Sequence, residues 1–236
     1  MSHMDAAALA AWFRTLYGGP PRGIIFDCDG VVIDSREANI AYYNYLRKFI
    51  GLPSLAPEQE DFVQAATVSQ ALDAIIPSAL RPLLRDAGRQ VSYERDILPR
   101  ITCFAGLHET LELCRMAGLR TGMATNRTDG MEALLRQCRL QGCFDPIVLA
   151  CDVPRPKPAP DGALLIASRW NEQPSHLLFI GDSASDKRAA EGAGIPFLAF
   201  QTQGLAEHGI AGFAVLTAAL RSLAHTVPQH FTDVYL

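Results

Sequence analysis

Short apolar runs recur along the chain, and each is followed by a turn or by the start of a helical pattern. They are rich in isoleucine, leucine, valine and phenylalanine and cover residues 23–26, 119–125, 147–150, 177–180 and 196–200. Continuous apolar runs of this length are typical of strands that are buried on both faces of a parallel sheet. The pattern therefore predicts five parallel strands.

Helical patterns lie between most of these runs and after the last one. They cover residues 107–117, 129–140, 161–170, 183–193 and 213–224. Gly118 and Gly194 come directly after two of them, at the position where a helix favours glycine as its C-cap. Strands that alternate with helices through short connections predict an α/β fold, a doubly wound Rossmann-like parallel sheet with helices on both faces.

The segment from residue 35 to residue 100 breaks this alternation. It contains no strand-like run and offers helical stretches at 37–49 and 59–76, with prolines at positions 53, 57, 77, 82 and 99. Because proline interrupts a helix, several helices joined by turns are expected. We predict a core domain of residues 1–34 and 101–236, with an all-α helical domain of residues 35–100 inserted after the first strand.

Composition narrows the class of protein. Of the 236 residues, 49% are apolar and 19% are charged, as in an ordinary globular protein. A net charge of -4 without any basic cluster argues against a nucleic-acid partner. No apolar run reaches about 18 residues and no basic segment precedes the stretch 6–13, so neither a membrane span nor a signal peptide is expected. Because the six cysteines form no CxxC pair and lie mostly in apolar stretches, we predict a cytoplasmic protein.

Asp27 and Asp29 are the most informative polar residues, because they stand where the run 23–26 ends and Gly30 begins. Open α/β sheets bind their ligands at the carboxyl ends of their strands. Two carboxylates about 4 Å apart repel each other by about 4 kcal/mol at an effective dielectric constant near 20. A cation must offset this repulsion. If that cation is a metal ion, one carboxylate can attack an electrophile while the other moves a proton.

Other polar groups follow the next predicted strands. Thr125 and Asn126 end the second run, Lys157 lies in a proline-rich loop after the third, and Asp182 and Asp186 follow the fourth. Because the carboxyl ends of parallel strands meet at one edge of a sheet, we expect these side chains to lie close to Asp27 and Asp29. One lysine and four carboxylates would then share one site.

Most of these residues also have a purely structural interpretation. Thr125 could cap the helix that follows it, although Asp129 could take that place instead. Lys157 could be a solvated loop lysine. Asp182 and Asp186 could simply complement the dipole of the next helix with negative charge. A second carboxylate at position 29 gains nothing structurally, so it favours the catalytic interpretation.

Four segments, taken in chain order, resemble the four signature segments of the haloacid dehalogenase superfamily. They are Asp27-x-Asp29-Gly30, Thr125, Lys157 and Gly181-Asp182-x3-Asp186. The chain is similar to superfamily members with a helical cap, of the phosphoglycolate phosphatase and β-phosphoglucomutase types. The resemblance implies that Asp27 is the nucleophile, which forms an aspartyl-phosphate. It also implies that Asp29 protonates the leaving alcohol and then activates water.

The resemblance further implies a magnesium site and a phosphate site. The implied ligands of Mg²⁺ are Asp27, Asp29 through its backbone carbonyl, Asp182, and Asp186 as a ligand or as a holder of ligands. The implied phosphate-binding residues are Thr125, Asn126 and Lys157, of which Thr125 and Lys157 also count as catalytic. Oxygen ligands with retained waters suit Mg²⁺. Arg127 could reach a substrate phosphate or face the solvent.

The acid at position 29 also indicates phosphate-ester chemistry, since the resemblance implies that dehalogenases and phosphonate-cleaving members lack it. We predict a Mg²⁺-dependent phosphatase, a monomer or homodimer, that acts on a small phosphorylated metabolite of the sugar phosphate or phosphoglycolate type. A sugar phosphomutase with the same motifs is the alternative, and a non-catalytic binding module is a third. Specificity would lie in the cap, with candidates Arg36, Tyr42, Tyr43, Asn44, Arg47, Lys48, Gln70 and Arg81.

Overall fold

The computed structural model describes residues 3–65 and 68–224, and the chain divides into two compact units. The first unit consists of Met1–Val32, Cys103–Asp129 and Leu140–Leu236, and the second of Ile33–Thr102 and Gly130–Arg139. Each unit has a hydrophobic core of its own. Two short strands, β2 (Ile33–Asp34) and β3 (Thr102–Cys103), pair where the chain passes from one unit to the other.

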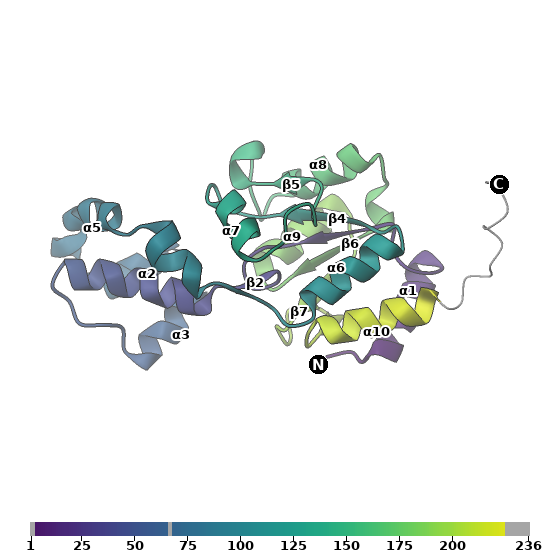
Figure 1. Ribbon diagram of the computed structural model, residues 1–236, viewed down its shortest axis with the longest axis horizontal. Coiled ribbons are helices and arrows are strands. Elements are labelled where there is room, and N and C mark those ends of the chain that lie inside the picture. The colour runs from purple at the N-terminus through teal and green to yellow at the C-terminus, as the bar shows by residue number, and fades with distance from the viewer. Residues whose placement is uncertain (1–2, 66–67, 225–236) are drawn as a thin grey trace. The chain divides into compact units, whose positions relative to one another are not determined.

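A six-stranded parallel sheet forms the centre of the first unit (Figure 1), in the order β5-β4-β1-β6-β7-β8. The strands are β1 (Gly23–Phe26), β4 (Arg120–Ala124), β5 (Ile147–Val148), β6 (Leu177–Gly181), β7 (Phe197–Phe200) and β8 (Gly209–Ile210). The predicted α/β fold is confirmed, and the five expected strands are all present. The sixth, β8, was missed because two residues do not stand out as an apolar run. The strand order reverses at β1, which puts its carboxyl end at the topological switch point.

Helices cover the sheet as expected for a doubly wound fold. The helices of this unit are α1 (Ala6–Tyr17), α6 (Leu107–Met116), α8 (Asp161–Trp170), α9 (Ala184–Ala193) and α10 (Phe213–Ala224). Helices α8 and α9 pack together, and α10 packs against both α1 and α6. Helix α1 was not predicted, although Asp5 caps its start by accepting a hydrogen bond from the backbone of Ala8 and Gly18 follows its end at a φ of 74°. Its two cap residues were therefore readable in the sequence.

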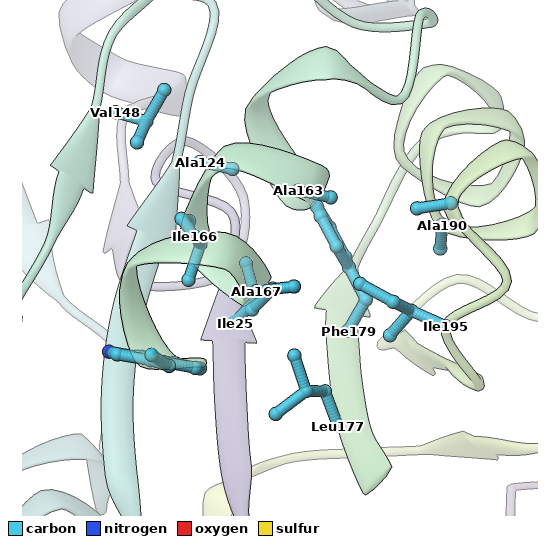
Figure 2. Close-up of a cluster of buried hydrophobic side chains, with 12 residues drawn as sticks. Ile25, Ala124, Val148, Ala163, Ile166, Ala167, Leu177, Phe179, Ala190 and Ile195 are labelled. Carbon is cyan, nitrogen blue, oxygen red and sulfur yellow. The ribbon is translucent and has the colours of Figure 1, made fainter. Parts of the chain in front are cut away.

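One buried hydrophobic cluster of the first unit lies between the sheet and helices α8 and α9. Figure 2 shows Ile25 of β1, Phe179 of β6 and Ile166 of α8 within this cluster of buried side chains. Helix α8 thus turns one apolar face to the strands whose carboxyl ends carry the site. Burial of that face holds the strand ends in register.

Replacing Ile166 with alanine should lower the free energy of unfolding by about 2–5 kcal/mol, because it removes a buried side chain and leaves a cavity. Leu164 on the same helix offers a matched control, since it is 41% exposed whereas Ile166 is fully buried. Leu164→Ala should change the free energy of unfolding by less than about 1 kcal/mol. Urea titration of both variants measures the difference, and equal losses would contradict the packing described here.

Apart from strand β2 and Thr102 of β3, the described elements of the second unit are helical. Its elements are α2 (Arg36–Phe49), α3 (Pro57–Ala65), α4 (Val68–Ile75), the 3₁₀ turns η1 (Ser78–Leu83) and η3 (Leu98–Arg100), α5 (Leu84–Gln90), the π-helical turn η2 (Tyr93–Ile97) and α7 (Met131–Gln137). Residues 66–67, inside the stretch predicted as helical, lie outside the described residues. Tyr43, Leu46 and Ile76 are among the side chains buried at the centre of this unit.

The grouping of residues into units differs from the predicted domains at residues 130–139, and by two residues at each boundary of the insertion. Residues 130–139, which the sequence prediction placed in the core domain, group with the inserted helices. Helix α7 contacts η3, and Gly130 lies so close to Tyr93 that a Cβ there would be 2.8 Å from its ring. The boundaries of independently folding domains therefore stay a proposal.

Candidate active site

The seven residues predicted to form the site all line one cavity of about 320 Å³ in the first unit. Its lining comprises Asp27, Asp29, Thr125, Asn126, Arg127, Lys157, Asp182, Ser183, Ser185 and Asp186. The residues follow the carboxyl ends of β1, β4, β5 and β6, as the parallel topology requires. Arg127 and two serines join the predicted set.

Lys157 is the central cation of the cavity. Its side chain is only 7% exposed, and its ammonium donates hydrogen bonds to Asp27 and, at 2.6 Å, to Oδ1 of Asp186. Burial alone would lower the pKa of Lys157, but the two carboxylates outweigh it, so the pKa is raised and the side chain stays charged. The interpretation of Lys157 as a solvated loop lysine is therefore wrong.

Too few cations face the acidic residues around Lys157. Burial raises the pKa of Asp27, the charges of Asp186 and Asp182 raise it further, and Lys157 only partly opposes them. Burial and the charge of Asp186 raise the pKa of Asp182 to about 6. Three buried or half-buried carboxylates thus share one ammonium, which is the condition in which a further cation binds favourably.

Asp186 serves the helix and the site at once. Its Oδ2 accepts hydrogen bonds from the backbone of Ser183 at 3.1 Å and from the Ser183 hydroxyl at 2.5 Å, while the same hydroxyl accepts from the backbone of Asp186 at 3.2 Å. This capping box begins helix α9. The helix-terminal interpretation of Asp186 is therefore right, but it does not exclude a role in the site, because Oδ1 remains bound to Lys157.

The acidic cluster fits a magnesium ion. Asp27, Asp182 and Asp186 each place a carboxylate oxygen within 4.8 Å of the others. Octahedral Mg²⁺ holds oxygens at about 2.1 Å, so opposite ligands lie about 4.2 Å apart, close to this spacing. The donor set consists of oxygen only, as Mg²⁺ prefers. The side chain of Asp29 is not part of the cluster, as expected if only its backbone carbonyl were a ligand.

Gly30 keeps open the space that Asp182 occupies. A Cβ built at Gly30 would lie 2.0 Å from Oδ2 of Asp182, and the backbone there has a φ of 81°. Only glycine adopts this conformation readily, and only a residue without a side chain leaves the carboxylate in place. Gly30 of the first signature segment thus leaves the space that the carboxylate of Asp182, in the fourth segment, occupies.

Gly30→Ala should weaken Mg²⁺ binding by about tenfold or more, because Asp182 must move away from the cluster. Gly204→Ala is the matched control, since Gly204 has a φ of 77° but no atom within 4 Å of a built Cβ. Both variants should lose about 1–2 kcal/mol of stability through backbone strain. Calorimetric titration with Mg²⁺ separates them, and equal affinities would contradict the clash with Asp182.

The loop after β4 is held by hydrogen bonds from several directions. The backbone N–H of Thr125 donates to the carbonyl of Val148 at 3.0 Å, and the Asn126 amide donates to the carbonyl of Lys157 at 2.9 Å. Helix α7 begins at Met131 after Gly130, which supplies no side-chain cap. Neither Thr125 nor Asp129 caps that helix, so both structural interpretations were wrong, and Thr125 lines the cavity instead.

Arg127 forms the contact that the sequence did not resolve. Its Nε and Nη2 donate to the two carboxylate oxygens of Asp29 at 2.7 and 2.8 Å, and its side chain is 17% exposed. Arg127 therefore does not simply face solvent, and the adjacent carboxylates of the first segment have separate cations, Lys157 for Asp27 and Arg127 for Asp29. The position of Arg127 just beyond the end of a predicted strand was the feature of the sequence that could have indicated a place in the site.

Several of the specificity candidates have internal contacts. Arg47 is buried and donates to the backbone carbonyls of Pro53 and Ile75, and Tyr43 lies in the core of the second unit. Arg36 pairs with Asp61 on the surface. These contacts give Arg47 and Tyr43 a structural role in the helical unit, which argues against their direct contact with a substrate.

The fold and the site together define an α/β protein of the Rossmann-like type, with an acidic cluster and a buried lysine at the carboxyl edge of a parallel sheet. The family model described as haloacid dehalogenase-like hydrolase matches residues 24–200, and the chain belongs to this family. The predicted family and the prediction of an enzyme, a hydrolase with phosphatase relatives, are thereby confirmed.

Relatives of known name extend the comparison. The chain is 27% identical to a phosphoglycolate phosphatase of Nitrosospira multiformis, over 74% of this chain and 81% of the relative. It is 29% identical to the phosphoglycolate phosphatase of Escherichia coli K12, over 74% and 79%. A haloacid dehalogenase superfamily hydrolase of subfamily IA from Geobacter sulfurreducens aligns with a TM-score of 0.77 at 27% identity, over 86% of this chain and 98% of that one.

In the part of the chain that the structure describes, no helix combines the length and the apolar character that crossing a membrane requires.

Proposed function

We propose that this protein is a Mg²⁺-dependent phosphatase that hydrolyses a small phosphorylated metabolite through an aspartyl-phosphate on Asp27. The observation that carries the proposal is the contact of Lys157 with Asp27 in a cavity that also contains Asp29 and Thr125. The phosphoglycolate phosphatase relatives favour phosphoglycolate or a sugar phosphate as the substrate class.

In the first step a carboxylate oxygen of Asp27 attacks phosphorus as the bond from phosphorus to the ester oxygen breaks. Asp29 gives a proton to the departing oxygen as this bond breaks, so the alcohol leaves neutral. In the second step Asp29 takes a proton from water as the water oxygen attacks the same phosphorus. The bond to Asp27 breaks, inorganic phosphate forms, and the Asp27 carboxylate is restored.

The remaining residues of the cavity position the phosphoryl group. The Thr125 hydroxyl accepts a hydrogen bond from the backbone of Arg127 at 3.1 Å, so its own proton can be donated to a phosphoryl oxygen. The Lys157 ammonium lies between Asp27 and Asp186 and supplies positive charge to the transferred group. Held by Asp27, Asp182, Asp186 and the Asp29 carbonyl, Mg²⁺ would supply the further positive charge that lets an anionic carboxylate approach an anionic phosphate.

Release of inorganic phosphate from a panel of phosphorylated metabolites, with Mg²⁺ and with EDTA, tests the proposal. We expect Mg²⁺-dependent release from at least one small ester, with phosphoglycolate and sugar phosphates ahead of the rest. Absence of Mg²⁺-dependent release from every ester would overturn it. Isomerised sugar phosphate without matching phosphate release would identify the phosphomutase alternative instead.

We further propose that the protein works in the cytoplasm as a monomer or homodimer. The six cysteines all lie in the described part of the chain and none forms a disulfide bond; Cys28, Cys114 and Cys138 are buried as expected, whereas Cys151 is exposed. Free thiols are typical of a reducing compartment.

A further inference from the structure

The sequence-based prediction left Arg127 open between contact with a substrate phosphate and exposure to solvent, whereas the structure places it in direct contact with the proposed acid–base residue. We propose that Arg127 is a positioning residue, which fixes the carboxylate of Asp29 so that it can exchange a proton with the leaving oxygen and then with water. The inference rests on the proposed function and deepens it, because it concerns how the proton is delivered.

The contact has the geometry that fixes a carboxylate most firmly. Two parallel N–H groups of one planar guanidinium meet the two oxygens of Asp29 at 2.7 and 2.8 Å. Such a fork determines the plane and the direction of the carboxylate as well as its distance. Asp29 needs this restraint, because its side chain is 38% exposed and shares the cavity with the negative charges of Asp27 and Asp182.

Arg127 is itself held in place by the loop that binds the phosphoryl group. Its backbone N–H donates to the Thr125 hydroxyl at 3.1 Å, and its carbonyl accepts from the backbone of Ala150 at 3.0 Å. The phosphate-binding hydroxyl and the acid–base carboxylate are therefore linked through one residue. Arg127 thus fixes the position of the proton donor relative to the position of the phosphate.

The fork also leaves Asp29 able to react. A carboxylate offers about four lone-pair sites, and the two N–H groups of Arg127 occupy only two of them. One site on each oxygen remains for a proton that goes to the ester oxygen in the first step or comes from water in the second. Arg127 can therefore hold Asp29 throughout the reaction without itself touching the reacting atoms.

Leaving-group dependence tests this role. In single-turnover measurements with Mg²⁺, Arg127→Gln should slow cleavage of an alkyl phosphate by about 10- to 100-fold, because alkoxide needs a positioned proton donor. It should slow p-nitrophenolate release from p-nitrophenyl phosphate by less than about threefold, because this phenolate leaves without a proton. The preserved p-nitrophenolate burst also shows that the variant is folded.

A double variant separates positioning from a general structural effect. Asp29→Asn should show the same selective loss on the alkyl ester, and adding Arg127→Gln to it should cause no further loss, since both act through one carboxylate. Arg127→Lys, which keeps the charge but not the fork, should fall between Arg127→Gln and the wild type. Arg115→Gln is the matched control, because Arg115 makes the same fork with Glu112 at 2.8 and 2.6 Å on the surface, and it should leave both esters unaffected.

Three results would overturn the positioning role. They are equal losses on the two esters, full additivity with Asp29→Asn, and a raised KM for both esters with an unchanged single-turnover rate, which would make Arg127 a phosphate contact. If the wild-type protein cleaved neither ester, the proposed function itself would fail, and that outcome is distinct from all three.

Discussion

Asp27→Asn should abolish phosphate release, with a loss of about 10⁴-fold or more on every ester that the wild-type protein hydrolyses. A neutral amide oxygen is a poor nucleophile, and two neighbouring carboxylates are held by other contacts, Asp186 by Lys157 and Ser183 and Asp29 by Arg127. The measurement is inorganic phosphate release in the presence of Mg²⁺. A stopped-flow trace should also lack any burst of leaving alcohol.

The loss should not come from unfolding. Burial raises the pKa of Asp27, so its negative charge is less favourable here than in water, and a neutral amide of the same shape replaces the carboxylate at small cost. Lys157 keeps Asp186 as its partner. Urea titration should therefore give a free energy of unfolding close to that of the wild type.

Glu112→Gln provides the matched control for this experiment. It makes the same change from acid to amide and breaks an ion pair with Arg115 on helix α6, outside the cavity. Its phosphate release should equal that of the wild type. Residual turnover of Asp27→Asn near the wild-type rate would show that another group is the nucleophile.

Sequence patterns predicted which residues would meet in one cavity, because the parallel topology brings the ends of its strands together. Asp27, Thr125 and Asp182 are far apart in the chain, but each directly follows a buried apolar run. Once those runs are recognised as parallel strands of one sheet, their carboxyl ends must share one edge. The apolar pattern therefore predicted which residues would meet before any distance was known.

Side-chain pairing and short elements could not be predicted in this way. The fork between Arg127 and Asp29 depends on the direction of two side chains, which residue spacing does not specify. Strand β8 has only two residues, and its pairing with β7 comes from tertiary contact rather than from local preference. Helix α7 starts after Gly130 without a side-chain cap, so the acid at position 129 suggested a helix start two residues too early.

Lys157→Met should impair both turnover and stability, which sets it apart from Asp27→Asn. Phosphate release should fall by about 10³-fold or more, because the Lys157 ammonium supplies positive charge beside the transferred phosphoryl group. The free energy of unfolding at pH 8 without Mg²⁺ should fall by about 3–5 kcal/mol, because Asp27 and Asp186 stay buried without their partner. Lys187→Met on helix α9 is the control, since Lys187 is 37% exposed and contacts Glu191 and the carbonyl of Leu205.

The stability loss of Lys157→Met should depend on pH in a definite direction. The pKa values of Asp27 and Asp182 are raised even with Lys157 present, the latter to about 6, and removal of the ammonium raises them further. The folded variant then binds protons that the unfolded chain, with carboxyl pKa values near 4, releases above about pH 4. The loss should therefore be small near pH 4 and grow as the pH rises through the folded pKa values.

Mg²⁺ at pH 8 should restore part of the stability, because it supplies the missing positive charge to the same oxygens. A loss that is equal at pH 5 and pH 8 and insensitive to Mg²⁺ would mean that Lys157 contributes through packing rather than through its charge.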